Sequence, residues 1–200
     1  MMKGYFKSRY SDAPILAFGF HGCRQSVADK VLCDHEDLRD SINDYDWLGR
    51  GKYFWEANPD RAYEWASLRY GEQDDGPAVI GACIDLTRCL NLIDTEALNR
   101  LSSAYIAFKF LAELAGRKMP TNGNASKNGD KLLRKLDCAV VNFLCGIHAT
   151  VHGESVSVVR GVFWEGKELY RDAGFKEKNH IQLCVRDPKS ILCYFHPRCF

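Results

Sequence analysis

The sequence lacks several features that would place it in a specialised class. No apolar stretch approaches the ~18 residues needed to cross a bilayer, and the first residues lack the apolar core of a secretory signal peptide. Neither charge is in excess, since 27 basic side chains stand against 26 acidic ones. A generic polyanion-binding protein would be strongly basic, so this class is disfavoured. We expect a cytoplasmic chain that makes no membrane contact.

The cysteines lack the spacing of a metal ribbon or redox motif. There are nine of them, an odd number, and no two form a C-x-x-C pair. Several lie within apolar runs, where a free cysteine behaves as a small buried hydrophobe. We therefore expect reduced thiols rather than a disulfide framework. With 200 residues and 46% hydrophobic side chains, the chain is long enough for one domain with a full core.

The order of apolar patterns predicts an α+β fold. Runs rich in β-branched and aromatic residues predict strands at 14–22, 52–55, 78–85, 157–164, 180–185 and 190–195. Helical spacing predicts helices at 24–33, after Asn58-Pro59, from a Thr95 cap to 114, and at 132–145. Strands at both ends of the chain would surround the helices.

Two segments carry most of the local charge. Residues 29–46 hold seven carboxylates and a net charge of −5, which we interpret as a solvated helix end and loop. Residues 116–135 hold a net charge of +5 around a polar, Asn/Gly-rich stretch at 121–129, which predicts a mobile surface loop. This basic segment is either a solvated face or a surface that steers a phosphate-bearing acceptor. Its basic residues are Arg117, Lys118, Lys127, Lys131, Arg134 and Lys135.

Two fragments combine groups suited to binding a flat heteroaromatic ligand. Phe20-His21-Gly22-Cys23 places an imidazole at a strand end, next to a glycine that allows close approach to the backbone. Gly49-Arg50-Gly51-Lys52-Tyr53-Phe54-Trp55 places aromatic rings beside a Gly-x-Gly turn. Taken separately, each also fits an ordinary role, the histidine as a hydrogen-bonded core residue and the rings as core.

In this order the fragments resemble the poly-ADP-ribose-polymerase-like ADP-ribosyltransferases, whose signature is His, Tyr and Glu on three separate strands. His21-Gly22 matches the first motif, with Cys23 where the family usually has Ser or Thr, and Gly49 to Phe54 matches the second. The third motif best matches the stretch from Gln182 to Pro188, with glutamine in place of the glutamate. The resemblance covers about 15–66 and 155–196, while 86–150 matches nothing in the family.

The resemblance implies a fold and a set of site residues. The fold would be one domain over 1–200, a split β-core of two small antiparallel sheets flanked by helices, with a helical insertion and polar loop at about 95–150. NAD would be the co-substrate, without a metal. The family pattern assigns catalysis to His21, Tyr53 and Gln182. It assigns NAD binding to His21, Gly22, Cys23 and Tyr53, with Tyr63 preferred over Trp65 as a second stacking ring.

The glutamine in the third motif changes the expected chemistry. A glutamate about 4 Å from the forming sugar cation would contribute up to ~4 kcal/mol at an effective dielectric near 20. Gln182 can hydrogen-bond the ribose but brings no charge. We therefore expect single transfer rather than chain elongation, unless Glu56, Glu154 or Glu177 supplies the charge. Alternatively, Gln182 faces solvent on an edge strand.

The resemblance therefore implies a mono-ADP-ribosyltransferase that modifies nucleic acid or protein. Small bacterial enzymes of this kind act as toxins or phage-defence effectors, so a neutralising antitoxin or inhibitor is an expected partner. The alternatives are an NAD glycohydrolase and a degenerate binding module without catalysis. Cys145, His148 and His152 have metal-ligand types but lack a second ligand pair, so we predict a helix end with a turn at Gly153 and no metal site.

Overall fold

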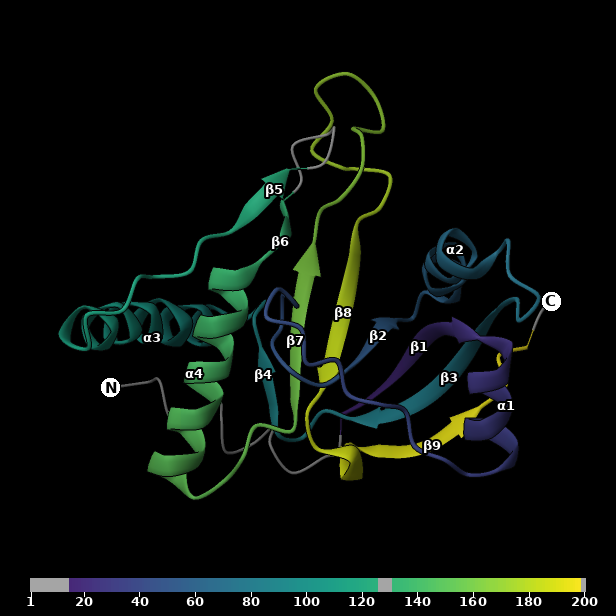
Figure 1. Cartoon of the computed structure of the whole chain (residues 1–200), viewed down its shortest axis with the longest axis horizontal. Helices are drawn as coiled ribbons and strands as arrows, with labels where there is room; N and C mark the ends of the chain where they lie inside the picture. Colours follow the sequence, from purple (N-terminus) through teal and green to yellow (C-terminus); the bar gives the residue numbers. More distant parts are fainter. Residues whose placement is uncertain (1–14, 126–130, 199–200) are drawn as a thin grey trace.

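The computed structural model describes residues 15–125 and 131–198 of the chain (Figure 1). Its helices are α1 (Gln25–Cys33), α2 (Pro59–Tyr70), α3 (Thr95–Leu114) and α4 (Lys135–His152), with a short 3-10 turn at Pro188–Ser190. Its strands are β1 (Leu16–Arg24), β2 (Lys52–Glu56), β3 (Pro77–Asp85), β4 (Cys89–Asn91), β5 (Gly123–Ala125), β6 (Lys131–Leu133), β7 (Val158–Phe163), β8 (His180–Val185) and β9 (Ile191–Phe195). The predicted α+β class is confirmed.

The main sheet has seven strands in the order β4-β7-β8-β2-β1-β3-β9, and β5 and β6 form a separate ribbon. It is mixed, because β4 and β7 run parallel while the other pairs are antiparallel. The expected division into two small antiparallel sheets differs from this arrangement. Hydrogen bonding continues across the centre because β2 pairs with β8 on one edge and with β1 on the other.

The two halves of the sheet are joined by a very short ladder. β1 and β2 share two residue pairs, Gly19 with Glu56 and Phe20 with Trp55. Beyond Phe20, β1 continues along β3 as far as Arg24, while it no longer pairs with β2. One edge of β1 at residues 21–24 therefore has no strand beside it in the described chain.

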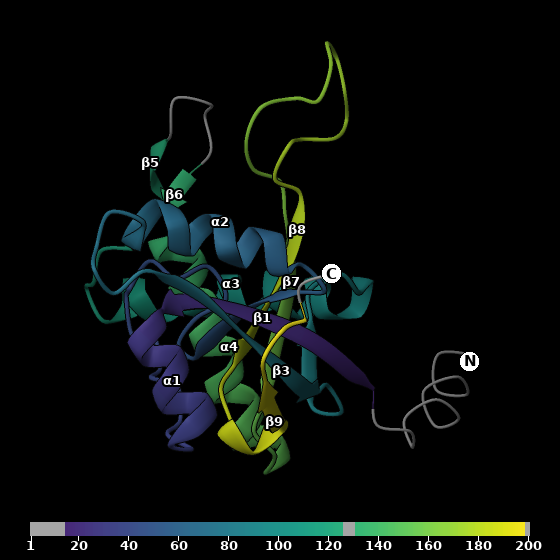
Figure 2. The same cartoon turned by 90° about the vertical axis from the view of Figure 1, so that its right-hand side faces the viewer.

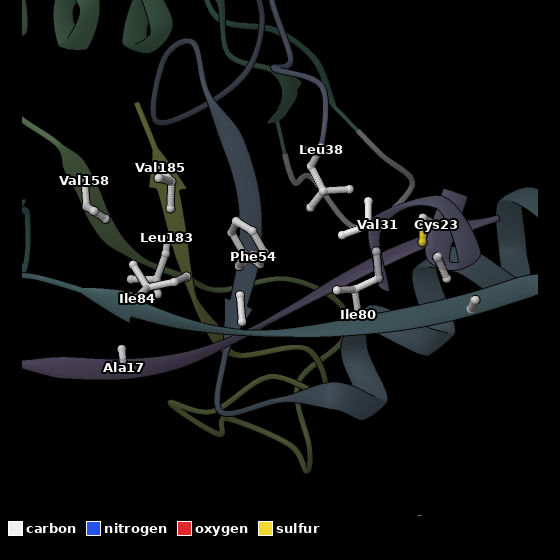
Figure 3. Close-up of a cluster of buried hydrophobic side chains, with 13 residues drawn as sticks. Ala17, Cys23, Val31, Leu38, Phe54, Ile80, Ile84, Val158, Leu183 and Val185 are labelled. Carbon is white, nitrogen blue, oxygen red and sulfur yellow. The ribbon is translucent and has the colours of Figure 1, made fainter. Parts of the chain in front are cut away.

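Two buried clusters lie on the two faces of this sheet. The first contains Phe54 of β2 and Leu183 of β8 together with Ile80 and Ile84 of β3, and α1 adds Val31 (Figure 3). The second packs α3 and α4 against the β7–β8 half. α2 covers β1 on the face opposite α1, as Figure 2 shows.

The helix boundaries follow local chemistry. The predicted start of α2 is confirmed, since the Asn58 side chain accepts a hydrogen bond from the Arg61 amide at 3.0 Å and Pro59 is the first helical residue. The predicted Thr95 cap is wrong by one residue. Asp94 caps α3 by accepting hydrogen bonds from two backbone amides, and Thr95 is the first helical residue.

The region after α3 differs from the sequence prediction. The predicted helix from 132 begins at Lys135, because Lys131–Leu133 pairs with β5 as β6. Part of the predicted surface loop at 121–129 is thus the strand Gly123–Ala125, and residues 126–130 lie outside the described residues. Among the residues the structure covers, no helix is long and apolar enough to span a membrane.

The β3–β9 register makes a prediction about two thiols. Cys83 and Cys193 are free and lie directly opposite each other, which brings cross-strand Cβ atoms to about 4.5–5.5 Å. A disulfide needs about 3.5–4.5 Å, so a small local shift of the strands is enough to join the two sulfurs. Diamide should take two hydrogens from this pair and leave a Cys83–Cys193 disulfide, found by peptide mass spectrometry. Cys193→Ser should abolish that peptide pair, and crosslinks that all avoid Cys83 would contradict the register.

Candidate functional site

A cavity of about 810 Å³ lies where β1 leaves β2. Residues 21–24 of β1, α1, residues 36–41 and the C-terminal half of α2 line it. Its volume is within the range of small-molecule sites. A second, more apolar cavity of about 470 Å³ lies between α3, α4 and β7, and of the residues singled out in the sequence only Arg134 of the basic segment lines it.

His21 lies at the point where the strands part. Its Nδ1 is 2.8 Å from the Tyr53 carbonyl oxygen, and because a carbonyl only accepts, Nδ1 carries the proton and Nε2 keeps a lone pair. Burial lowers the pKa of His21, although its bond to Tyr53 opposes this effect, so the imidazole is neutral. His21 lines the cavity.

The next two residues of β1 also line the cavity. Gly22 lies directly beneath α2, because a Cβ there would collide with the Ala62 carbonyl oxygen. Burial raises the pKa of the Cys23 thiol to about 12. Cys23 is therefore a protonated wall residue and not a nucleophile.

The strand register separates the His21 imidazole from the Tyr53 phenol. Side chains directly opposite each other in a sheet project from the same face, and neighbours along a strand project from opposite faces. Phe20 pairs with Trp55, and Trp55 pairs with Gln182, so Tyr53 shares their face. His21 lies on the other face, where its ring is 5.8 Å from Phe54. The structure thus makes these residues neighbours but does not bring imidazole and phenol into one cavity.

The Tyr53 hydroxyl is engaged by the loop that precedes β2. It donates a hydrogen bond to the Gly49 carbonyl oxygen at 2.6 Å and accepts one from the Leu48 amide at 3.1 Å. Its ring packs against the cluster beneath α4, and burial raises the pKa of the phenol far above its ordinary value. Tyr53 holds the Gly49–Gly51 turn in place, and it lines neither of the two cavities.

Gln182 occupies an interior strand. β8 lies between β7 and β2, so the alternative that Gln182 sits on an edge strand is wrong. Its partners on either side are Gly161 and Trp55. Gln182 shares a face with Tyr53 and Trp55 but lines neither cavity.

Of the two rings considered as a second stacking surface, Trp65 lines the cavity and Tyr63 does not. Tyr63 is 54% exposed on the outer side of α2. The Trp65 ring centroid lies 6.0 Å from that of Trp55, so it connects the cavity wall to the central strand.

The carboxylates considered as substitutes for the missing glutamate lie elsewhere. Glu56 is held by two hydrogen bonds from Arg160, at 2.6 and 2.9 Å. Glu154 is exposed after α4, and Glu177 is exposed in the segment between β7 and β8. None of these three described carboxylates lines the larger cavity.

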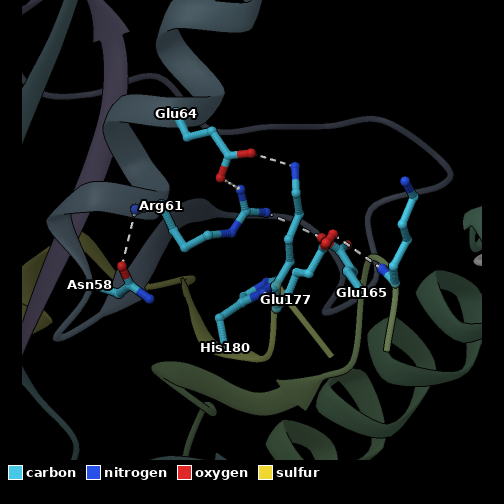
Figure 4. A network of polar contacts seen from close by, with 8 residues as sticks. Asn58, Arg61, Glu64, Glu165, Glu177 and His180 are labelled. Carbon is cyan, nitrogen blue, oxygen red and sulfur yellow. Dashed lines mark hydrogen bonds and ion pairs between the residues drawn. The ribbon is translucent and has the colours of Figure 1, made fainter. Parts of the chain in front are cut away.

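A polar network around Arg61 and His180 was not predicted from the sequence (Figure 4). Arg61 of α2 contacts Glu64 at 2.5 Å and Glu165 at 3.3 Å, and Lys178 also contacts Glu64. These ion pairs attach the segment between β7 and β8 to α2. The sequence signal was the spacing of His180 and Gln182, two polar residues that a strand places on the same face.

His180 is the buried residue of this network. It is 6% exposed, and its Nδ1 lies 2.6 Å from the Lys178 carbonyl oxygen. His180 Nε2, Trp55 Nε1 and Arg61 Nε are buried without a hydrogen-bond partner among the described residues. Such a concentration of unsatisfied polar atoms is unusual for a purely structural region.

Two residues of the predicted basic surface, Arg134 and Lys135, have structural contacts. Arg117 and Lys118 are exposed after α3, Lys127 lies outside the described residues, and only the backbone of Lys131 is described. Arg134 stacks over the Trp47 ring at 4.1 Å and pairs with Asp137, while Lys135 pairs with Asp44. These last two residues thus have structural contacts.

The expected helix end and turn near residue 153 are confirmed, since α4 ends at His152 and Gly153 has φ +69°. Within the described ranges, no group of three or more His, Cys, Asp or Glu side chains is placed to hold a metal ion.

In comparisons with known proteins, no protein family, curated protein or solved structure matches the chain.

The buried phenol makes a stability prediction. Tyr53→Phe leaves the Leu48 amide without its partner and the Gly49 carbonyl with only the weak Cys184 thiol donor at 3.6 Å, which should cost about 1–3 kcal/mol of unfolding free energy. Urea unfolding would measure this loss, with the exposed Tyr45→Phe as a matched control. Equal stability of the two variants would show that the phenol does not hold the loop.

Burial of His180 predicts acid sensitivity. Burial lowers its pKa below the ordinary value near 6.5, so the unfolded chain binds a proton at pH values where the folded protein does not. Stability is therefore complete above about pH 6.5 and falls as the pH drops toward the folded pKa. The slope contributed by one histidine is at most about 1.4 kcal/mol per pH unit. His180→Gln should flatten the stability–pH curve measured by urea unfolding, leaving the contribution of His21; an unchanged curve would contradict this assignment.

Proposed function

We propose that the protein is an NAD-dependent mono-ADP-ribosyltransferase that transfers one ADP-ribose unit to a nucleic-acid or protein acceptor. The finer fold assignment, an ADP-ribosyltransferase core, belongs to the same proposal. The observation that carries it is the junction of the three motif strands. β1, β2 and β8 are far apart in the chain but adjacent in the sheet, and the cavity opens at the residue after the last β1–β2 pair.

The chemistry of the cavity supports a dinucleotide. Its walls combine the exposed edge of β1, a neutral imidazole, aromatic rings of α2 and several basic side chains. Flat rings suit stacking of nicotinamide or adenine, and basic groups suit the diphosphate. The second cavity also has aromatic rings, but its one basic side chain, Arg134, offers less to a diphosphate.

In this proposal each residue has a definite role. Transfer breaks the bond between nicotinamide and ribose, and positive charge develops on the sugar. His21 Nε2 accepts a hydrogen bond from a ribose hydroxyl, and the β1 backbone at Gly22 pairs with the nicotinamide amide. Tyr53 acts as a positioning residue through the Gly49–Gly51 turn, because its hydroxyl is bound there. The rate enhancement then comes mainly from orientation of the bound NAD.

The family pattern gives Gln182 a hydrogen-bonding role without charge, whereas the structure leaves Gln182 outside the lining of both cavities, so this role belongs to the proposal alone. The nearest alternative acid in the sequence motif, Glu56, is neutralised by Arg160. This favours an acceptor that is already a good nucleophile and supports single transfer over chain elongation. A neutralising protein partner is part of the proposal only as what the family resemblance implies.

The uncharged Gln182 and the bound Tyr53 hydroxyl favour a second candidate, a binding module that keeps NAD affinity without catalysis. The two candidates share the cavity and differ in whether nicotinamide is released. An NAD glycohydrolase would release it without a macromolecular product.

The test is incubation of the protein and bacterial cell extract with NAD labelled in the adenylate phosphate. Label on a macromolecule supports transfer, and its loss on nuclease or protease digestion identifies the acceptor class. Free ADP-ribose alone would indicate hydrolysis. Saturable NAD binding without nicotinamide release would indicate the binding module, and absence of both binding and release would reject the proposal.

A variant pair sharpens this test. Gln182→Ala should lower nicotinamide release by about tenfold or more, the equivalent of one lost hydrogen bond of ~1.4 kcal/mol. Gln182→Glu should retain or raise the rate, because it supplies charge near the sugar. Gln25→Ala, on α1 outside the lining of the cavity, is the matched control. Equal rates in all three variants would remove Gln182 from the site.

A further inference from the structure

Helix α3 carries a row of exposed apolar side chains along its outer side. Leu98, Ile106, Phe110 and Leu114 are 46%, 66%, 63% and 76% exposed, and the exposed Ser102 completes a row of five residues spaced four apart. We call these five residues the α3 row. Single apolar residues on a surface are ordinary, whereas a continuous apolar row marks an interaction surface.

The α3 row has the shape of a helix-packing surface with Ile106 at its centre. Successive residues of a helix turn by about 100°, so Ile106 lies opposite Ala97 and Ala104, which are buried in the cluster under α3 and α4. In Figure 1, α3 crosses α4 and its C-terminal half extends beyond it. Side chains four apart form a ridge, and two such ridges interdigitate in the commonest helix–helix packing. The row is therefore suited to contact with another helix.

The α3 row is complementary to itself. A two-fold axis at Ile106 runs the helices of two copies antiparallel and places Leu98 opposite the partner's Leu114. The same axis places Ser102 opposite the partner's Phe110, so a small residue faces a large one. None of the five residues is charged, and such a contact buries no unpaired charge. A second copy of the chain thus fits this row.

The second cavity offers space for the larger residue of that pair. Leu98 and Ser102 line the cavity and are exposed, so it opens at the α3 surface. Trp47 and Phe163 line it as well, with ring centroids 4.3 Å apart. An aromatic side chain placed over Ser102 meets these rings and apolar walls. In the two-fold arrangement this side chain is the partner's Phe110.

The charges at the two ends of α3 favour the antiparallel arrangement. Asp94 and Glu96 lie at its start, Arg117 and Lys118 follow its end, and all four are exposed. A parallel pair of helices would bring like charges together. An antiparallel pair brings the acidic end of each helix toward the basic end of the other, which supports association in this orientation.

We infer that α3 is a homodimer interface, in which two α3 rows pack antiparallel about Ile106 and each Phe110 meets the second cavity of the other copy. A contact made by one helix of each copy is smaller than the about 1,200–2,000 Å² of stable interfaces, so the dimer is weak and depends on concentration. The inference concerns a different face from the larger cavity and does not rest on the proposed function.

Sedimentation equilibrium from about 1 µM to about 1 mM protein covers the affinities expected of such a dimer. Ile106→Glu places two carboxylates together at the axis and should weaken dimerisation by about 100-fold or more. Leu68→Glu, at a 79% exposed position of α2, is the matched control and should dimerise like the wild type. A monomeric wild type over the whole range, or equal effects of the two substitutions, would overturn the inference.

Disulfide trapping tests the register independently. Ser102→Cys and Phe110→Cys are prepared separately, mixed, and treated with diamide, which takes one hydrogen from each of two thiols as the disulfide forms. Peptide mass spectrometry should find a 102–110 pair in the mixture. Neither variant alone should give a pair with itself, because equal positions lie about 12 Å apart along the helix axis. A 102–102 pair, or a mixture without the 102–110 pair, would reject the antiparallel contact.

Discussion

The structure depends on a two-residue ladder between β1 and β2. Without the pairs Gly19–Glu56 and Phe20–Trp55, the β4-β7-β8-β2 half and the β1-β3-β9 half would be separate sheets. The His21–Tyr53 hydrogen bond closes the junction from the cavity side. Because the ladder is so short, the strands diverge immediately, and this divergence creates the cavity. Sheet continuity and an open site thus come from the same few residues.

This junction explains why the sequence predicted the strands but not their faces. β2 is buried on both sides, with Phe54 in one cluster and Tyr53 in the other, so its aromatic run has no visible alternation. The order of motifs predicted three strands that the structure makes adjacent. Whether His21 and Tyr53 share a face depends on register, and a shift of one residue would reverse the answer. Register is set by long-range pairing, which a single sequence does not display.

Predictions that depend only on neighbouring residues were accurate, and those that depend on long-range packing were not. The start of α2 is determined by the adjacent residues Asn58 and Pro59, and that prediction is confirmed. β4 and the β5–β6 ribbon are three-residue strands with no periodic signal of their own. Trp65 and Tyr63 cannot be distinguished by spacing alone. Only the packing of α2 onto Gly22 decides which ring turns toward the cavity.

Two carboxylates of the acidic segment 29–46 form ion pairs that hold the segment against the sheet. We expected 29–46 to be solvated, and Asp37 and Asp40 are 50% and 43% exposed, but both also pair with Lys52, which is 5% exposed. Asp37 also accepts a hydrogen bond from the Tyr194 hydroxyl at 2.6 Å, which attaches the segment to β9. A buried lysine requires such partners, because an unpaired charge away from water is costly. The same pairing fixes residues 36–41 as a wall of the cavity and occupies two carboxylates that would otherwise repel an anion.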